Sequence, residues 1–387
     1  MSLRKNILFI CSFLLLLLAP FLVKVLHIPV DETNSEKRII SSPPAFTLDK
    51  AKASKGAWNT FHGFNEDLAI YKERFNSYHE TNFNLKNNLF DLYVFIKRSL
   101  LKGNPIPMSV MEGYDGWFFL GNSYSNAMLE YAALSNFTTK ETDSVKRNVS
   151  DIASWLKKRH IGFYIVITPD KQRVYGQYLP LVKGNKKTKL EQLKTEAYDQ
   201  SYNLLDLGEI LKKHNRQYRL FHKTDTHWND YGAFAGFQAL IAELQKSYPQ
   251  IPQLDIGNFK IDTAVTYEKD LTEALRLKIR EDQVRLRYII PEHGELQENT
   301  LTVPQSEGVN PHGYEVRYAN SRRKLKVLIF RDSFSEAWMQ YFKECFGSCL
   351  FIRNYIIDKA LIEQEAPDIV IYQKIERDID VLLIPAS

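Results

Sequence analysis

The stretch that decides the fold is KLKVLIFRDSFSEAWMQYFKECFGSCLFIRNYIIDKALIEQEAPDIVIYQKI, residues 324–375. Three short apolar runs in it, residues 324–330, 349–353 and 368–374, alternate with two segments of helical spacing. Strand–helix–strand order at this spacing predicts parallel strands, because each helix carries the chain back to the start of the next strand. The stretch therefore predicts an α/β fold with a three-layer open parallel sheet.

The same alternation extends towards the N-terminus. GFYIVIT (162–168) and QYRLFHK (217–223) have the β-branched and aromatic composition of strands. The spacing predicts helices over about 139–159, 186–214 and 230–248. GYDGWFFLGN (113–122) predicts a hairpin, and about 250–320 breaks the pattern like an insertion with hairpin character.

The first residues predict a membrane anchor. Arg4 and Lys5 precede an apolar run over 7–23, and no A-x-A-like cleavage site follows it. We therefore expect residues 1–26 to be an uncleaved signal anchor rather than a cleaved signal peptide. The basic residues should stay in the cytoplasm, so the rest of the chain would face outward. In a bacterium this predicts a single-pass protein of the inner membrane with a periplasmic or extracellular domain.

The remaining chain is predicted to be a linker over 27–56 and one domain over 57–387. Its 44% apolar and 25% charged residues exclude disorder and collagen. The net charge of +5 is spread among 46 acidic residues, which does not favour nucleic acid as a partner. Cys345 and Cys349 could form a disulfide in an oxidising compartment, although Gly347 between them favours placement on different elements.

Three predicted strand ends lead into polar clusters, at 169–175, 224–228 and 331–334. Because sites in open parallel sheets form at the carboxyl ends of strands, these clusters should meet. Ser333 lies at a strand-to-helix turn, where amide groups can stabilise an oxyanion. Asp225 and His227 can supply the base and the orienting acid that a serine nucleophile needs.

Other interpretations of these residues stay open from the pattern alone. Ser333 could simply cap the following helix. Asp225 and His227 could form a turn with a half-exposed histidine, or be two ligands of an incomplete metal site. HExxH, paired CxxC, P-loop, GxGxxG and GxSxG motifs are absent from the sequence, so no metal or cofactor is predicted.

KTDTHWNDYGAF (223–234) together with FRDSF (330–334) resembles the alginate O-acetyltransferase family, whose members carry an SGNH-hydrolase-like domain. Further segments resemble the family in the same order, including 36–44, 168–180, the DLTEAL segment near Asp270, and 367–377. Arg331 departs from the glycine that often precedes Asp-Ser in the family, and no clear asparagine completes an oxyanion hole.

The resemblance implies Ser333 as nucleophile, His227 as general base and acid, and Asp225 as the residue that orients His227, in permuted chain order. It implies an O-acetyltransferase acting on a cell-surface or exported polysaccharide. A membrane-bound O-acyltransferase partner would supply the acetyl group, without a cofactor in this chain. Lys171, Tyr175 and Arg331 are candidate substrate-binding residues. An acetylesterase with the same triad, or a non-catalytic glycan-binding subunit, remains an alternative.

Overall fold

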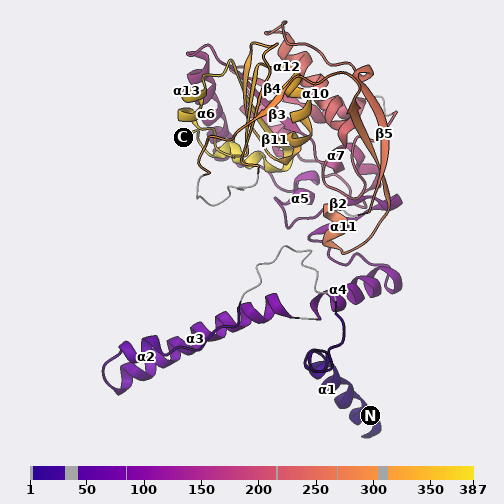
Figure 1. The fold of residues 1–387 in the computed structure, drawn as a ribbon, viewed down its shortest axis with the longest axis vertical. Helices are drawn as coiled ribbons and strands as arrows, with labels where there is room; N and C mark the ends of the chain where they lie inside the picture. The colour runs from indigo at the N-terminus through magenta and orange to yellow at the C-terminus, as the bar shows by residue number, and fades with distance from the viewer. Residues whose placement is uncertain (1–2, 31–41, 84, 215–216, 268, 304–312) are drawn as a thin grey trace. The chain divides into compact units, whose positions relative to one another are not determined.

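The computed structural model describes residues 3–30, 42–83, 85–214, 217–267, 269–303 and 313–387 (Figure 1). The chain divides into two compact units. The first comprises Met1–Pro105 with Ala274–Arg276, and the second comprises Ile106–Glu273 with Leu277–Ser387. The first unit holds α1 (Leu3–Val25), α2 (Asp49–Ala53), α3 (Ala57–Asn82), α4 (Lys86–Phe95) and the π-helix η1 (Ile96–Leu100).

Helix α1 occupies the segment that we predicted to be a signal anchor. Within the described ranges, no helix combines the length and the apolar character needed to cross a bilayer. The anchor over 1–26 therefore stays a prediction. Of the predicted linker over 27–56, residues 31–41 lie outside the described part of the chain. We predicted the domain from residue 57, whereas the compact α/β unit begins at Ile106.

A seven-stranded mixed sheet forms the centre of the second unit, in the order β4-β3-β11-β9-β10-β8-β7. The first five strands of this order run parallel, and the last two pair antiparallel. The prediction of a parallel sheet is thus confirmed for the centre and wrong for one edge. Only residues 320–325 join β8 to β9, too few for the crossover that parallel strands need. The strands are β3 (Gly162–Thr168), β4 (Asn203–Asp206), β7 (Glu295–Gln297), β8 (Glu315–Ala319), β9 (Lys326–Phe330), β10 (Ser348–Ile352) and β11 (Ile369–Ile375).

The structure differs from the predicted secondary structure in two segments. Residues 217–223 form no strand; they hold one isolated bridge, Phe221–Trp228, and bury Leu220 and Phe221 in a loop. One edge strand of the sheet, β4, lies inside the segment 186–214 that helical spacing had predicted to be a helix. Burial of apolar side chains from a loop and from a strand leaves the same pattern, so periodicity alone could not separate them.

Side chains of the central strands alternate between two cores. Val166, Ile329 and Ile371 face one cluster, which also includes side chains of α10 (Asp230–Gln245) and α12 (Met339–Cys345). Ile165, Leu328 and Val370 face the other, which includes α6 (Thr139–Lys157) and α13 (Lys359–Glu365). Helices therefore cover both faces of the sheet, as Figure 1 shows, and the predicted three-layer architecture is confirmed.

The predicted hairpins are present. β1 (Val110–Glu112) pairs with β2 (Phe118–Leu120), and β5 (Phe259–Thr266) pairs with β6 (Glu281–Tyr288), both antiparallel. Cys345 ends α12 and Cys349 lies on β10, and both thiols are free and buried. The remaining elements are α5 (Ala127–Tyr131), α7 (Lys171–Tyr175), α8 (Lys189–Gln192), α9 (Leu207–Lys213), α11 (Asp270–Ala274), η2 (Tyr114–Gly116), η3 (Gly176–Tyr178), η4 (Leu193–Ala197), η5 (Ile256–Asn258), η6 (Ser333–Trp338) and η7 (Glu376–Leu383).

Candidate active site

The turn after β9 presents Ser333 at the carboxyl end of the sheet. Ser333 is the first residue of the 3₁₀ helix η6, and the residue that caps this helix is Asp332. The Asp332 carboxylate accepts hydrogen bonds from the amides of Phe334 (2.8 Å) and Ile375 (2.6 Å) and from Nε2 of Gln373 (2.9 Å). The capping interpretation of Ser333 is therefore wrong, and its hydroxyl is available for another partner.

That partner is the imidazole of His227. Its Nε2 lies 2.8 Å from Oγ of Ser333, although the two residues are 106 positions apart in the chain. On the other side of the ring, Nδ1 lies 2.7 Å from Oδ1 of Asp225, which also accepts the His227 amide at 2.9 Å. The structure thus brings Ser333, His227 and Asp225 together in the order that a serine proton relay needs.

Buried groups hold the loop that carries Asp225 and His227. The ammonium of Lys171 donates to the backbone carbonyls of His222 and Lys223, both at 3.1 Å, and of Asp225 at 2.7 Å. The carboxylate of Glu281, on β6, accepts the amide of Lys223. Because these donors and acceptors are buried and paired, the loop has few alternative conformations of similar energy.

The charge distribution suits a general base. Burial alone would lower the pKa of His227, but the hydrogen bond to Asp225 and the charges of Asp225 and Asp270 outweigh burial, so the pKa is raised above 6.5. Burial would raise the pKa of Asp225, yet its bonds to His227 hold that pKa well below its usual value. Asp225 therefore stays ionised and stabilises a positive charge on the ring.

The three predicted substrate-binding residues all hydrogen-bond to other parts of the protein. Lys171, Tyr175 and Arg331 are all buried, at 2%, 4% and 1% exposure. Lys171 holds the loop as described above. The hydroxyl of Tyr175 accepts the Leu220 amide at 2.9 Å. A buried lysine or tyrosine that supports a loop looks in sequence like one that lines a pocket, because both follow a strand end.

Arg331 replaces a glycine of the family pattern, and its side chain joins neighbouring loops through hydrogen bonds. Its guanidinium donates to the carbonyl of Asp332 at 3.2 Å, to Glu336 at 2.9 Å and to the carbonyl of Gly313. Its own backbone amide donates to the carbonyl of Ile352, the last residue of β10, at 2.8 Å. This amide is therefore engaged in the fold and is not available to stabilise an oxyanion.

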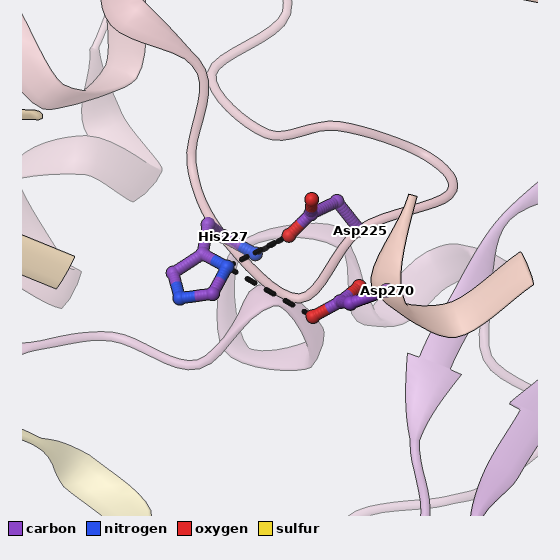
Figure 2. Close-up of side chains that lie close together, drawn as sticks. All are labelled: Asp225, His227 and Asp270. Atoms are coloured by element: carbon purple, nitrogen blue, oxygen red, sulfur yellow. Dashed lines mark hydrogen bonds and ion pairs between the residues drawn. The ribbon is translucent and has the colours of Figure 1, made fainter. Parts of the chain in front are cut away.

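Two charged residues close to His227 were not predicted as site residues. Asp270, at the start of α11, places Oδ2 3.9 Å from Nδ1 of His227, and Figure 2 shows both Asp225 and Asp270 beside the ring. Arg377 has its guanidinium carbon 5.9 Å from the ring centre of Phe334, which packs on His227. Asp270 lies in the predicted insertion and Arg377 beyond the closing strand, so only the resemblance marked their segments.

The Asp225–His227–Asp270 cluster has the donor types of a metal site. The three candidate ligand atoms lie within 4.8 Å of one another in the described part of the chain. However, Nδ1 of His227 is hydrogen-bonded to Asp225, and Asp270 is hydrogen-bonded to Thr226. A metal would have to replace these hydrogen bonds, so the residues as placed fit a proton relay better than a coordination site.

Among solved structures, Bacillus cereus PatB1 with a sulfonyl adduct matches with a TM-score of 0.55 and 14% identity, over 72% of this chain and 98% of that one. PatB1 without the adduct matches with a TM-score of 0.52 and 14% identity, over 70% and 96%. The O-acetyltransferase domain of Pseudomonas putida AlgJ gives a TM-score of 0.42 and 17% identity, over 72% and 94%. At these identities the two PatB1 matches establish a shared fold alone.

No curated protein sequence matches the chain. A family model described as "SGNH hydrolase-like domain, acetyltransferase AlgX" matches residues 110–307. This segment is just over half of the 387 residues and contains Asp225, His227 and Asp270. The chain therefore belongs to the AlgX family of acetyltransferases with an SGNH-hydrolase-like domain.

Proposed function

We propose that this protein is an O-acetyltransferase that moves an acetyl group through Ser333 onto hydroxyls of a cell-surface or exported polysaccharide. The observation that carries the proposal is the line of contacts from Ser333 Oγ through the His227 ring to Asp225, at 2.8 and 2.7 Å. Membership of an acetyltransferase family supports the acetyl group as the cargo. The resemblance to alginate O-acetyltransferases supports a polysaccharide as the acceptor.

In the first half-reaction, Oγ of Ser333 attacks the carbonyl carbon of the acetyl donor while its proton moves to Nε2 of His227. Asp225 stabilises the resulting imidazolium and keeps Nδ1 protonated. The bond to the donor's leaving group then breaks, and the leaving group takes the proton from Nε2. The products are acetyl-Ser333 and the protonated leaving group, with His227 neutral again.

In the second half-reaction, a sugar hydroxyl replaces the leaving group. His227 takes the hydroxyl proton as the sugar oxygen attacks the acetyl carbon of acetyl-Ser333. The ester bond to Oγ breaks, and Oγ recovers a proton from Nε2. Water in the place of the sugar would give an esterase, so the choice of acceptor alone separates the two activities.

The test is acetyl turnover with and without an acceptor. The full-length protein is incubated with a chromogenic acetate ester, alone and with exported polysaccharides, and both free acetate and polymer-bound acetyl are measured. We expect polymer-bound acetyl in the wild type and none in Ser333→Ala, with Ser335→Ala as the matched control. Equal release of free acetate with and without polysaccharide would instead favour an esterase, and polysaccharide binding without any turnover would favour a binding subunit.

Another protein would deliver the acetyl group to this chain. We propose that a membrane-bound O-acyltransferase supplies it and that α1 attaches this protein to the same membrane. Support for attachment comes from the apolar side chains that α1 exposes, which include Ile7, Phe9, Phe13 and Leu15. Cell fractionation of the full chain and of a variant lacking residues 1–26 tests this. Equal distribution of the two between membrane and soluble fractions would contradict attachment.

A further inference from the structure

We infer that Asp270 is a positioning residue for His227, and that it acts together with Thr226 as a second acceptor arm beside Asp225. This inference rests on the proposed function, because it assigns Asp270 a task in the same proton relay. Asp270 belongs to α11, between β5 and β6. The segment that the sequence presented as an insertion thus contributes directly to the site.

The carboxylate of Asp270 is fixed by Thr226, the residue between Asp225 and His227. It accepts the Thr226 amide at Oδ1, 2.8 Å away, and the Thr226 hydroxyl at Oδ2. Two donors from one residue hold the carboxylate in a single orientation. In this orientation its Oδ2 lies 3.9 Å from Nδ1 of His227 (Figure 2). Asp270 therefore acts on the ring through its charge and through Thr226, without a direct hydrogen bond.

The hydroxyl of Thr226 connects the two residues. Its oxygen lies 3.2 Å from Nδ1 of His227. Since its single proton is donated to Asp270, the oxygen can only accept from the ring nitrogen. The Nδ1–H group therefore has a near acceptor in Asp225 at 2.7 Å and a weaker one in Thr226. Both acceptors favour the tautomer that leaves Nε2 unprotonated and facing Ser333.

Several other charged groups lie near this cluster and determine how strongly Asp270 favours protonation of His227. Asp225 and Asp270 both favour the protonated ring of His227, whereas Arg377, on η7, opposes it. Lys171 and Lys269 face the carboxylates: Lys171 donates to the Asp225 carbonyl, and Nζ of Lys269 lies 3.9 Å from Oδ2 of Asp225. His222 also contributes to the environment of Asp225. Two carboxylates thus share the task of stabilising one imidazolium among partly compensating cations.

Asp270 should matter most in the step in which His227 becomes charged. When Ser333 loses its proton to Nε2, the positive charge develops between both carboxylates. Replacing Asp270 by asparagine keeps an acceptor for one of the two Thr226 donors and removes one of the two negative charges. We therefore expect Asp270→Asn to lower the pKa of His227 by about one pH unit, a tenfold change in its dissociation constant.

The experiment measures the His227 titration directly by NMR in the full-length protein labelled at histidine, with the signal assigned by its loss in His227→Gln. Asp262→Asn is the matched control, because Asp262 lies on the neighbouring β5 with 37% side-chain exposure against 41% for Asp270. A lower pKa in Asp270→Asn alone supports the inference. An unchanged pKa, or an equal shift in Asp262→Asn, overturns it.

A second pair of variants decides the matter if Asp270→Asn does not fold. Thr226→Val removes the hydroxyl at nearly constant volume, and Thr226→Ser keeps it. A lowered His227 pKa in the valine variant that the serine variant restores supports the acceptor arm, and equal values in both contradict it. This readout needs no turnover, so absence of acetyl transfer in the wild type would refute the proposed function separately.

Discussion

The Ser333 hydroxyl can contact His227 because the neighbouring Asp332 caps the turn instead. Asp332 binds the Phe334 and Ile375 amides, and Gln373 on β11 donates to the same carboxylate. Their residue types and their places after apolar runs made Ser333, Asp225 and His227 candidates for a proton relay, and the family resemblance assigned their roles. The sequence could not identify the supporting role of Lys171, since a buried ammonium that binds carbonyls has no sequence pattern of its own.

At the scale of single residues, we predict that Asp225→Asn lowers turnover by on the order of 10³–10⁴-fold while the fold persists. The amide still occupies the position but no longer stabilises an imidazolium or enforces the tautomer. Steady-state kinetics with a chromogenic acetate ester measure the effect, and circular dichroism checks the fold. Turnover within a few-fold of the wild type would contradict the orienting role.

The pH dependence follows from the raised pKa of His227. The free enzyme needs a neutral ring to accept the Ser333 proton, so kcat/KM should rise with pH and level off above that pKa. Because Asp225 and Asp270 raise the pKa above 6.5, the midpoint should lie above 6.5. A pH–rate profile of the wild type measures the midpoint. A midpoint below 6.5 would show that burial outweighs the two carboxylates.

At the scale of elements, β3, β9, β10 and β11 could be predicted because buried parallel strands are continuous apolar runs. β4 was missed because it has four residues, and only one flanking strand pairs with it. The loop at 217–223 was mistaken for a strand, although it lies beside the site and the polar cluster after it does belong there. The position of the cluster was therefore predicted correctly, whereas the element that precedes it was not.

The close packing of α10 against the loop at 217–223 leads to a prediction about Gly232. A Cβ added at Gly232, in the first turn of α10, would lie 2.0 Å from the carbonyl oxygen of Leu220. Gly232→Ala should therefore destabilise the protein by about 1–3 kcal/mol through overpacking, and should displace the loop that carries His227.

Thermal unfolding and acetate-ester turnover measure both effects of this substitution. Gly103→Ala is the control, since its Cβ would meet its nearest atoms at an ordinary 3.9 Å. A Gly232→Ala variant as stable and as active as Gly103→Ala would show that the loop adapts freely.

At the scale of the whole molecule, the site belongs entirely to the second compact unit. We predicted one domain over 57–387, whereas the compact unit that holds the site begins at Ile106. The sequence pattern also could not predict that Asp270 lies beside His227. The contact between α11 and the loop at 224–228 joins segments that no local pattern connects.

Apart from Ala274–Arg276, residues 106–387 are the second unit, and we predict that they fold and retain acetate-ester turnover without residues 1–105. The expected result is turnover within about threefold of that of residues 57–387, because the residues of the relay and the loop supports described above lie after Ile106. Expression of both versions with kinetics and thermal unfolding tests it. Loss of folding in the shorter version alone would place the boundary at residue 57 instead.

If Ser333 carries the acetyl group, mass spectrometry of the trapped intermediate detects it there. The full-length protein is mixed with a chromogenic acetate ester, quenched in acid, digested and mapped. We predict an acetyl group on the peptide that contains Ser333, located on that residue and absent from Ser333→Ala. Acetylation at another residue, with turnover preserved in Ser333→Ala, would contradict it.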